Sequence, residues 1–199
     1  MENIITNINQ LDFSKKYSYA DYLKWQFEDR VELIKGWIYK VSPAPSRKHQ
    51  KIEGVIFANI WNHFRNKNCE VYNSPFDVRL TKNKGQTDLE TETVVQPDIV
   101  VVCNTSILDD RGCKGAPDLV VEVLSQSTLK KDFNEKFNLY EENQIKEYWL
   151  VHPELQTVET YILKEHKYEL NLRFEKAEGV ITSPQFADFS LDCREVFKD

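Results

Sequence analysis

The sequence predicts an α/β domain with a mixed central sheet, flanking helices and a C-terminal β-hairpin. Two short apolar runs carry this prediction, one over residues 96–103 and one over residues 118–124. Both are rich in Val, Ile or Leu and are bounded by Asp, Gly or Pro, which is typical of strands. A third observation is the pair of runs at 156–163 and 168–174, separated by a short polar segment, which indicates a hairpin. Because the first two runs are almost continuously apolar, we expect them to be buried on both faces.

Length and composition favour one domain. The chain of 199 residues is expected to fold as an N-terminal arm over 1–16 and a single domain over 17–199. Hydrophobic residues make up 41% of it and aromatic residues 12%, which predicts a packed globular core. No stretch of about 18 apolar residues occurs, so no membrane helix is expected. The first residues also lack the basic and apolar regions of a secretory signal.

Charge and cysteine content narrow the function classes. The formal net charge is −6, which argues against tight nonspecific binding to duplex DNA. It does not exclude a nuclease, because a carboxylate site adds negative charge that a metal ion cancels. The four cysteines are widely spaced and include no Cys-x-x-Cys pair, so neither a zinc site nor a redox pair is predicted. We expect Cys103 to pack as a small apolar residue in a reducing cytoplasm.

The N-terminal part is expected to contain a short helix and a hairpin. A capping-box pattern precedes a helix over about 19–27. Residues 30–41 contain two short β-type runs joined near Lys35-Gly36, which predicts two paired strands. Glu32 on the first strand is either an ordinary outward-facing residue or, if it faces inward, a third carboxylate of the site. In the second case it would accept a hydrogen bond from Lys136 or from water at a metal ion.

A long helix is predicted over residues 47–66, with Ser46 as its N-cap and one apolar stripe. His49 lies on that stripe in the first turn. It is either a hydrogen-bonded, half-buried histidine or a residue that contacts a phosphate or tunes nearby acids. Strands are expected to follow over 69–72 and 76–80.

Two polar loops, a helix and further strands are expected in the rest of the chain. The loops span 81–93 and 104–117, and the first leads directly to Asp98 and could touch substrate. The remaining predicted elements are a helix over 129–143, a strand over 146–151, the C-terminal hairpin and a short helix over 191–197.

Two carboxylates and a lysine mark the candidate site. Asp98 opens the first buried strand, Glu122 lies near the middle of the second, and we expect them to meet because neighbouring strands start from a common rim. An ionised Glu inside an apolar strand needs compensation, either from Asp98 with a bound metal ion or from a cation such as Lys136. On a helical wheel Lys136 lies about 60° from Phe133, at the edge of the apolar stripe, so its ammonium can reach under the sheet edge. Such a group suits metal-assisted phosphodiester hydrolysis, whereas otherwise the acids cap turns and the lysine is solvated.

These residues carry a resemblance to a known family. The segments that carry it are Val-Gln-Pro-Asp-Ile-Val-Val-Val at 95–102, Gly-Ala-Pro-Asp-Leu-Val-Val-Glu-Val-Leu-Ser at 115–125, Glu-Lys-Phe-Asn-Leu-Tyr at 135–140 and Glu-Tyr-Trp-Leu-Val at 147–151. They resemble the Uma2 family, also called DUF820, a bacterial group of restriction-endonuclease-like proteins in the PD-(D/E)XK nuclease superfamily. The resemblance extends over almost the whole chain.

The resemblance implies a restriction-endonuclease-like fold and a metal-dependent nuclease. It implies that Asp98 and Glu122 ligate Mg²⁺ or Mn²⁺, with Glu32 completing the acidic cluster. Lys136 would position the attacking water and offset charge on the scissile phosphate. In the superfamily the lysine lies two residues after the second acid, where this chain has Leu124. The resemblance therefore implies that the family lysine has moved to the following helix, which points to Lys136.

The sequence thus predicts a hydrolase, a metal-dependent endonuclease that acts on DNA. It is expected to be cytoplasmic, to have no membrane partner and to cut both strands as a homodimer. Two alternatives stay open: a catalytically silent nucleic-acid-binding or regulatory module on a nuclease scaffold, and an enzyme that cleaves RNA or a small nucleotide.

Overall fold

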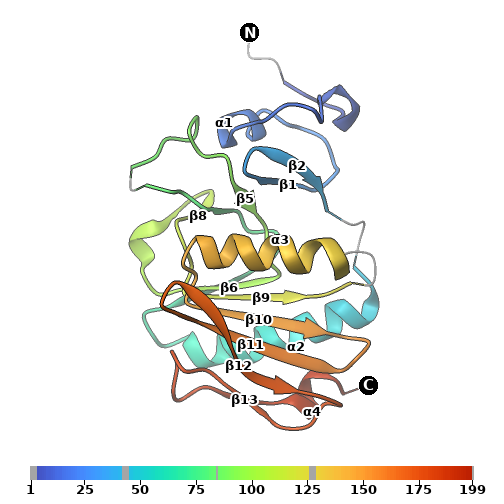
Figure 1. Cartoon of the computed structure of the whole chain (residues 1–199), viewed down its shortest axis with the longest axis vertical. Helices are drawn as coiled ribbons and strands as arrows, with labels where there is room; N and C mark the ends of the chain where they lie inside the picture. Colours follow the sequence, from blue (N-terminus) through green and yellow to red (C-terminus); the bar gives the residue numbers. More distant parts are fainter. Residues whose placement is uncertain (1–3, 42–44, 84, 126–128, 199) are drawn as a thin grey trace.

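The computed structural model describes residues 4–41, 45–83, 85–125 and 129–198, with only the backbone for 129–133. These residues form two six-stranded sheets, a separate strand pair and four α-helices. In Figure 1 the N-terminal segment and the second sheet lie at one end of the molecule, and the main sheet with the C-terminal hairpin lies at the other. The predicted α/β class is confirmed.

The main sheet holds the two apolar runs at its centre. Its strand order is β12-β11-β10-β9-β6-β3, and it is mixed because β9 and β10 are parallel while the other neighbours are antiparallel. The strands are β3 (Glu70–Asn73), β6 (Ile99–Val102), β9 (Leu119–Val123), β10 (Glu147–His152), β11 (Thr157–Lys164) and β12 (Lys167–Phe174). The mixed central sheet and the C-terminal hairpin of β11 and β12 are therefore confirmed.

A second sheet, which the sequence does not predict, has the order β2-β1-β5-β4-β8-β7. Its strands are β1 (Val31–Ile34), β2 (Trp37–Lys40), β4 (Val78–Arg79), β5 (Val94–Val95), β7 (Leu108–Asp109) and β8 (Gly112–Lys114). Only the hairpin of β1 and β2 has enough residues to show a strand pattern. The last two strands lie in segment 104–117, which we expected to be a loop, because runs this short cannot show alternation.

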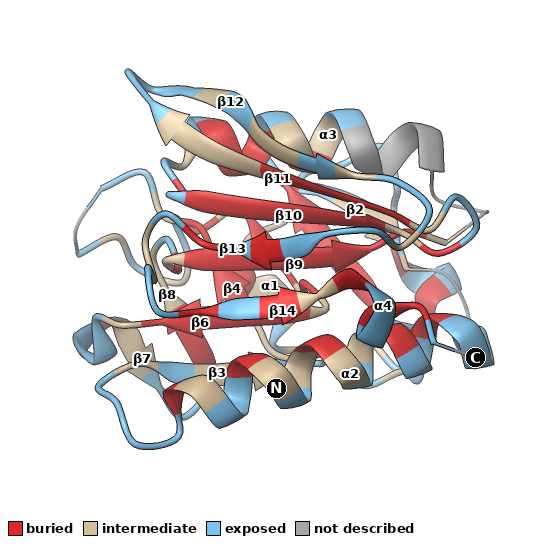
Figure 2. Cartoon of the chain, turned by 90° about the horizontal axis from the view of Figure 1, so that it is seen from below, coloured by how far each residue is buried: buried red, intermediate tan, exposed pale blue. Residues whose placement is uncertain are grey.

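Helices and the second sheet cover the two faces of the main sheet. Alternate residues of β9 face opposite ways: one set packs against α2 and the C-terminal segment, and the other packs against α3 and the second sheet. In Figure 2 the buried residues of α2 lie on its side toward the main sheet. None of the described helices is long and apolar enough to cross a membrane. The helices are α1 (Tyr19–Tyr22), α2 (Arg47–Phe64), α3 (Leu129–Glu142) and α4 (Cys193–Val196).

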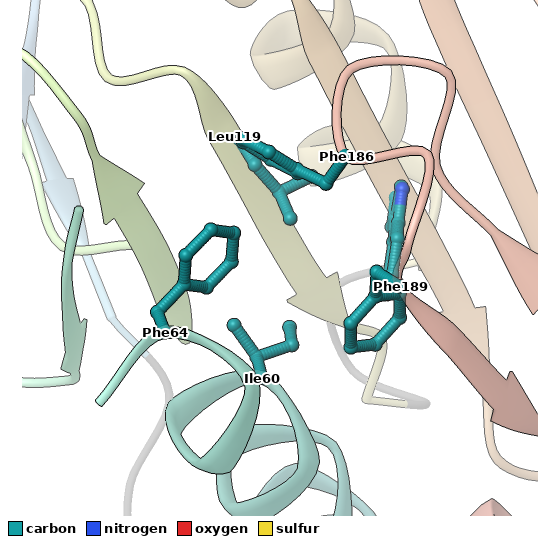
Figure 3. Close-up of a pocket in the computed structure, with 6 residues that line it drawn as sticks. Ile60, Phe64, Leu119, Phe186 and Phe189 are labelled. Atoms are coloured by element: carbon teal, nitrogen blue, oxygen red, sulfur yellow. The ribbon is translucent and has the colours of Figure 1, made fainter. Parts of the chain in front are cut away.

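Figure 3 shows how α2 packs on the main sheet near the C-terminal segment. Ile60 and Phe64 of α2 lie against Leu119 of β9, and Phe186 and Phe189 close the contact from the C-terminal side. All the lining side chains are apolar, so burial of this surface stabilises the fold and offers no group for chemistry.

The helix predicted over 19–27 ends early, at Tyr22, although its predicted capping box is present. The backbone of Ile5 donates to Lys24 and accepts from Gln26, so this part of the chain is drawn into an extended bridge. Tertiary pairing therefore overrides the local helix signal. The other short elements are η1 (Ile8–Gln10), η2 (Thr105–Ile107), β13 (Val180–Thr182) and β14 (Ser190–Asp192).

Cys69 and Cys103 form a disulfide between the ends of β3 and β6. The expectation that Cys103 packs as an unpaired apolar residue is therefore wrong. The two cysteines are 34 residues apart in the sequence, and the antiparallel register that pairs Glu70 with Val102 brings them together. The spacing of the cysteines in the sequence does not reveal the register between β3 and β6.

Candidate active site

The candidate site lies where a short segment passes from the second sheet into the main sheet. β5 ends at Val95 and β6 begins at Ile99, so the residues between them connect the two sheets. The backbone N–H of Gln96 donates to Oε1 of Glu32, a buried residue of β1, at 2.8 Å. This connection ties an acid of the second sheet to the residue two positions before Asp98.

Asp98 and Glu122 come together through the pairing of β6 with β9. Ile99 lies opposite Val121 in this antiparallel pair, and the same register continued by one residue places Asp98 opposite Glu122. The backbone N–H of Val123 donates to Oδ2 of Asp98 at 2.7 Å, which fixes the carboxylate beside β9. The two acids therefore meet because β6 starts where β9 ends. The expectation that the two strands start from a common rim is wrong.

Lys136 reaches two of the predicted acids from α3. Its Nζ lies 2.9 Å from Oε1 of Glu122 and 3.1 Å from Oε1 of Glu32, and all three residues are more than nine-tenths buried. The hydroxyl of Tyr140, one turn further along α3, donates to the same Oε1 of Glu122 at 2.6 Å. Lys136 thus lies where the helical wheel places it, although the side chain of Phe133, the reference of that wheel, is outside the described residues. Of the two alternatives for Glu32, the inward-facing one is correct.

The buried acids perturb one another. Burial raises the pKa of Glu122 to about 7, although the ammonium of Lys136 lowers it, because the charges of Asp98 and Glu32 add to the effect of burial. Burial and the charges of Glu122 and Glu32 raise the pKa of Tyr140 far above its usual range, so its hydroxyl remains a hydrogen-bond donor. The site has three carboxyl groups and one ammonium, so a bound cation could add positive charge there.

His49 lies on the other side of Asp98, in the first turn of α2. That turn is fixed by Ser46, whose Oγ accepts from the backbone N–H of His49 at 3.2 Å. Nε2 of the imidazole is 3.5 Å from Oδ2 of Asp98, and Nδ1 is 3.8 Å from Oε2 of Glu53. Burial lowers the pKa of His49, but the hydrogen bond and charge of Asp98, with the charge of Glu53, outweigh it and raise the pKa above its usual value. His49 is thus a buried histidine that contacts an acid of the site.

Glu53 belongs to this cluster, and sequence reasoning missed it. It lies one turn after His49 on α2, and 15% of its side chain is exposed. Burial and the negative charge of Asp98 raise the pKa of Glu53, while His49 lowers it. Residues four apart on a helix are neighbours, so the spacing from His49 is the signal that could have found Glu53.

The side chains present fit a divalent metal ion. Asp98, Glu122 and Glu32 carry carboxylate oxygens, the ligand type that Mg²⁺ and Mn²⁺ take in proteins. Among the described residues, however, the group whose ligand atoms all lie within 4.8 Å of one another consists of His49, Glu53 and Asp98. The buried Nδ1 of His49 has no hydrogen-bond partner among the described residues, and such a group calls for a ligand, ion or water.

Known proteins share this fold and sequence pattern. The family model for Uma2, described as "Putative restriction endonuclease", matches residues 19–194. The chain belongs to the Uma2 family. This match covers every residue of the candidate site and supports a nuclease of the restriction-endonuclease-like type.

One sequence relative and one solved structure are similar to this Uma2 chain. It is 27% identical over 180 residues to the uncharacterized protein slr1290 of Synechocystis sp., which covers 89% of this chain and 90% of that protein. Its structure is similar, with a TM-score of 0.71 and 20% identity, to a crystal structure of "a putative nuclease belonging to DUF820" from Anabaena variabilis. That likeness covers 91% of this chain and 97% of the other, and it shows the fold.

Proposed function

We propose that this Uma2 protein is a divalent-metal-dependent endonuclease that hydrolyses phosphodiester bonds of DNA. The observation that carries the proposal is the position of Lys136, which bridges Glu122 and Glu32 beside Asp98. A buried lysine between two acids, next to a third, provides the charge pattern for phosphoryl chemistry.

Each residue has a distinct role in this proposal. Asp98 and Glu122 hold the ion, which when bound would supply charge stabilisation for the phosphate and lower the pKa of water. Lys136 orients the attacking water and offsets negative charge on the scissile phosphate. Glu32, fixed by the N–H of Gln96, holds the ammonium of Lys136 in place at the site.

The surface near the start of α2 supports a nucleic-acid substrate. Arg47, Lys48 and Lys51 are exposed on the same turns that carry His49. Basic side chains at a site bind backbone phosphates without reading the sequence. The protein has a net charge of −6, so we expect weak binding that falls steeply with added salt.

The test is a set of cleavage assays on supercoiled plasmid, single-stranded DNA and RNA in Mn²⁺ or Mg²⁺. We expect nicking of plasmid by the wild type and a loss of at least about a hundredfold in Asp98→Asn, Glu122→Gln and Lys136→Met. Glu147→Gln, a buried acid of β10 outside the site, is the matched control and should keep its activity. Activity on RNA alone would move the assignment to a ribonuclease, and retained cleavage in all three site variants would remove the mechanism.

The proposal also covers the domain organisation, the oligomeric state and the cellular location. We propose that residues 17–199 act as one domain and that two copies pair, because a subunit with one site cuts two strands most readily as a dimer. Light scattering on the full chain, with and without DNA, measures this. A monomer under both conditions would remove the dimer. We also propose a DNA partner and a cytoplasmic setting, where reducing conditions would open the Cys69–Cys103 disulfide.

A further inference from the structure

A second group of ligand-type side chains lies on the α2 side of Asp98. His49 and Glu53 are one turn apart on the same face of α2, and Asp98 lies at the start of β6. One imidazole nitrogen and one carboxylate oxygen from each acid lie within 4.8 Å of one another. Small movements of flexible side chains would bring these atoms to the spacing of ligands around one ion.

The histidine in this group has a polar atom without a partner. His49 is 7% exposed, and its Nδ1 makes no hydrogen bond to any of the described residues. That atom lies 3.8 Å from Oε2 of Glu53, inside the cluster. A buried polar atom without a partner costs free energy, so a bound ligand at this position would remove that cost.

The two acids of the group also require positive charge. Carboxylate oxygens of Glu53 and Asp98 lie within 4.8 Å of one another, and Glu53 keeps only 15% of its side chain in contact with solvent. Lys136 lies on the opposite side, against Glu122 and Glu32. The charge of Arg30 also acts on Glu53, but its guanidinium donates to Gln96, so a metal ion bound between the two carboxylates would add positive charge there.

We infer that His49, Glu53 and Asp98 bind a divalent transition-metal ion, that this position prefers Mn²⁺ to Mg²⁺, and that Asp98 is shared between it and the Glu122 side of the site. The inference deepens the proposed function, because it names ligands and an ion that this function would use. Glu53 becomes a ligand of this ion.

The preference follows from the chemistry of the donors. Mg²⁺ takes oxygen ligands in near-octahedral geometry and loses its water reluctantly. Imidazole nitrogen suits first-row transition ions, and mixed nitrogen and oxygen sets bind them more tightly than they bind Mg²⁺. A histidine four residues before a glutamate on one helix face presents both donor types in the same direction.

The experiment measures binding of the metal alone by the full chain, without nucleic acid. Calorimetry with Mn²⁺ and then Mg²⁺ compares the wild type with Glu53→Gln and His49→Asn. We expect tighter binding of Mn²⁺ than of Mg²⁺ by the wild type, and at least about tenfold weaker Mn²⁺ binding in both variants. His49→Asn replaces nitrogen with an amide oxygen, so the ratio of Mn²⁺ to Mg²⁺ affinity should also fall.

Matched controls come from the other end of α2. His63 and Asp188 form a histidine–acid pair at 3.3 Å, and Asp188 is 71% exposed. His63→Gln and Asp188→Asn should leave Mn²⁺ affinity within about twofold of the wild type, a change well below that of a lost metal contact. Circular dichroism and thermal melting establish that Glu53→Gln and His49→Asn are folded.

Cobalt substitution gives a second readout that does not depend on affinity. Co²⁺ bound with a nitrogen ligand should give a visible absorption spectrum that changes in His49→Asn and not in His63→Gln. The inference is overturned if folded Glu53→Gln and His49→Asn bind Mn²⁺ as the wild type does, or if the wild type binds Mg²⁺ as tightly as Mn²⁺.

The inference and the proposed function fail in different ways. If cleavage needs Asp98 and Glu122 but Mn²⁺ binding is unaffected by Glu53→Gln, the inference is wrong and the nuclease proposal stands. If Mn²⁺ binding is lost in Glu53→Gln but the wild type cleaves neither DNA nor RNA, the inference is supported and the nuclease proposal is wrong.

Discussion

Two buried glutamates on neighbouring strands have their carboxyl groups compensated in different ways. Glu122 in β9 and Glu147 in β10 are 8% and 0% exposed. Glu147 is held by neutral donors: Nε1 of Trp149 donates to one oxygen at 2.7 Å, and Oγ of Ser183 donates to the other at 2.6 Å. Glu122 instead meets the ammonium of Lys136, in the presence of two further carboxylates.

The strand register shows that these glutamates serve opposite faces of the main sheet. Glu147 is paired with Leu119 in the parallel ladder, so it points to the α2 face, whereas Glu122 points to the face covered by α3. Burial of a carboxyl therefore shows only that it is compensated. The partners indicate its use: neutral donors complete a structural network, and a cation among several acids prepares a site for a further cation.

The largest effect is expected from removing the cation of the charged network. Lys136→Met should lower the free energy of unfolding by about 3–5 kcal/mol at pH 7, because Glu122 and Glu32 are left buried without their partner. Chemical denaturation at pH 7 and pH 5 measures this, and the loss should be smaller at pH 5, where Glu122, with its pKa raised to about 7, is neutral. Lys167→Met, which removes an exposed partner of Glu141, is the control and should change stability far less. Equal losses in the two variants would contradict the importance of Lys136.

The second prediction concerns the neutral network. Glu147→Ala should cost about 2–3 kcal/mol, because the indole N–H of Trp149 and the hydroxyl of Ser183 lose their acceptor. Glu147→Gln should cost less, since its amide oxygen still accepts one of these bonds. Denaturant titration gives the stabilities, and plasmid nicking should be unaffected in folded protein. A loss of nicking in Glu147→Gln would break the distinction between the two glutamates.

The third prediction is the pH dependence of stability. Burial raises the pKa of Glu122 to about 7 from an ordinary value near 4.5, so the folded state holds its proton more tightly than the unfolded state does. The stability linked to this group is fully present below about pH 4.5 and is lost as pH rises through about 7. We expect a fall on the order of 3 kcal/mol through this group, and a shallower fall in Glu122→Gln, both measured with a chelator present.

The same titration sharpens the comparison. Burial also raises the pKa of Glu147, but its hydrogen-bond partners are neutral. Carbon-13 NMR of the side-chain carboxyls should show that Lys136→Met raises the pKa of Glu122 further and leaves that of Glu147 in place. Movement of both pKa values would mean that the two networks are coupled through the sheet.

The sequence predicts those parts of the molecule whose signals are long or local. The apolar runs of β6 and β9, the capped helix α2 and the hairpin of β11 and β12 each carry a pattern of four or more residues. Strands as short as β5, β7 and β8 carry none, so the sequence predicts the pair β1 and β2 and the segment of β4 but not the sheet that they join. The link between Cys69 and Cys103 was missed because it depends on the register between β3 and β6.

The same limit applies to the candidate site. Lys136 could be found because a buried acid demands a cation and the helical period places this lysine on the inner edge of α3. The four-residue spacing on α2 places Glu53 beside His49, but the proximity of Glu53 to Asp98 could not be predicted, because it arises from the packing of α2 across the main sheet. The rule that a buried acid needs a cation does not hold for Glu147. Its carboxyl is buried, yet its donors Trp149 and Ser183 are neutral.

The smallest expected effects come from removing one hydroxyl from each network. Tyr140→Phe removes a donor to Glu122, and Ser183→Ala removes a donor to Glu147. Each should cost on the order of 1 kcal/mol, with the larger loss in Ser183→Ala, because Glu147 is left with the neutral donors Trp149 and Gln185 while Glu122 keeps the ammonium of Lys136. Denaturation of both variants at one pH measures the difference. A larger loss in Tyr140→Phe would mean that the phenol, and not the lysine, provides most of the compensation of Glu122.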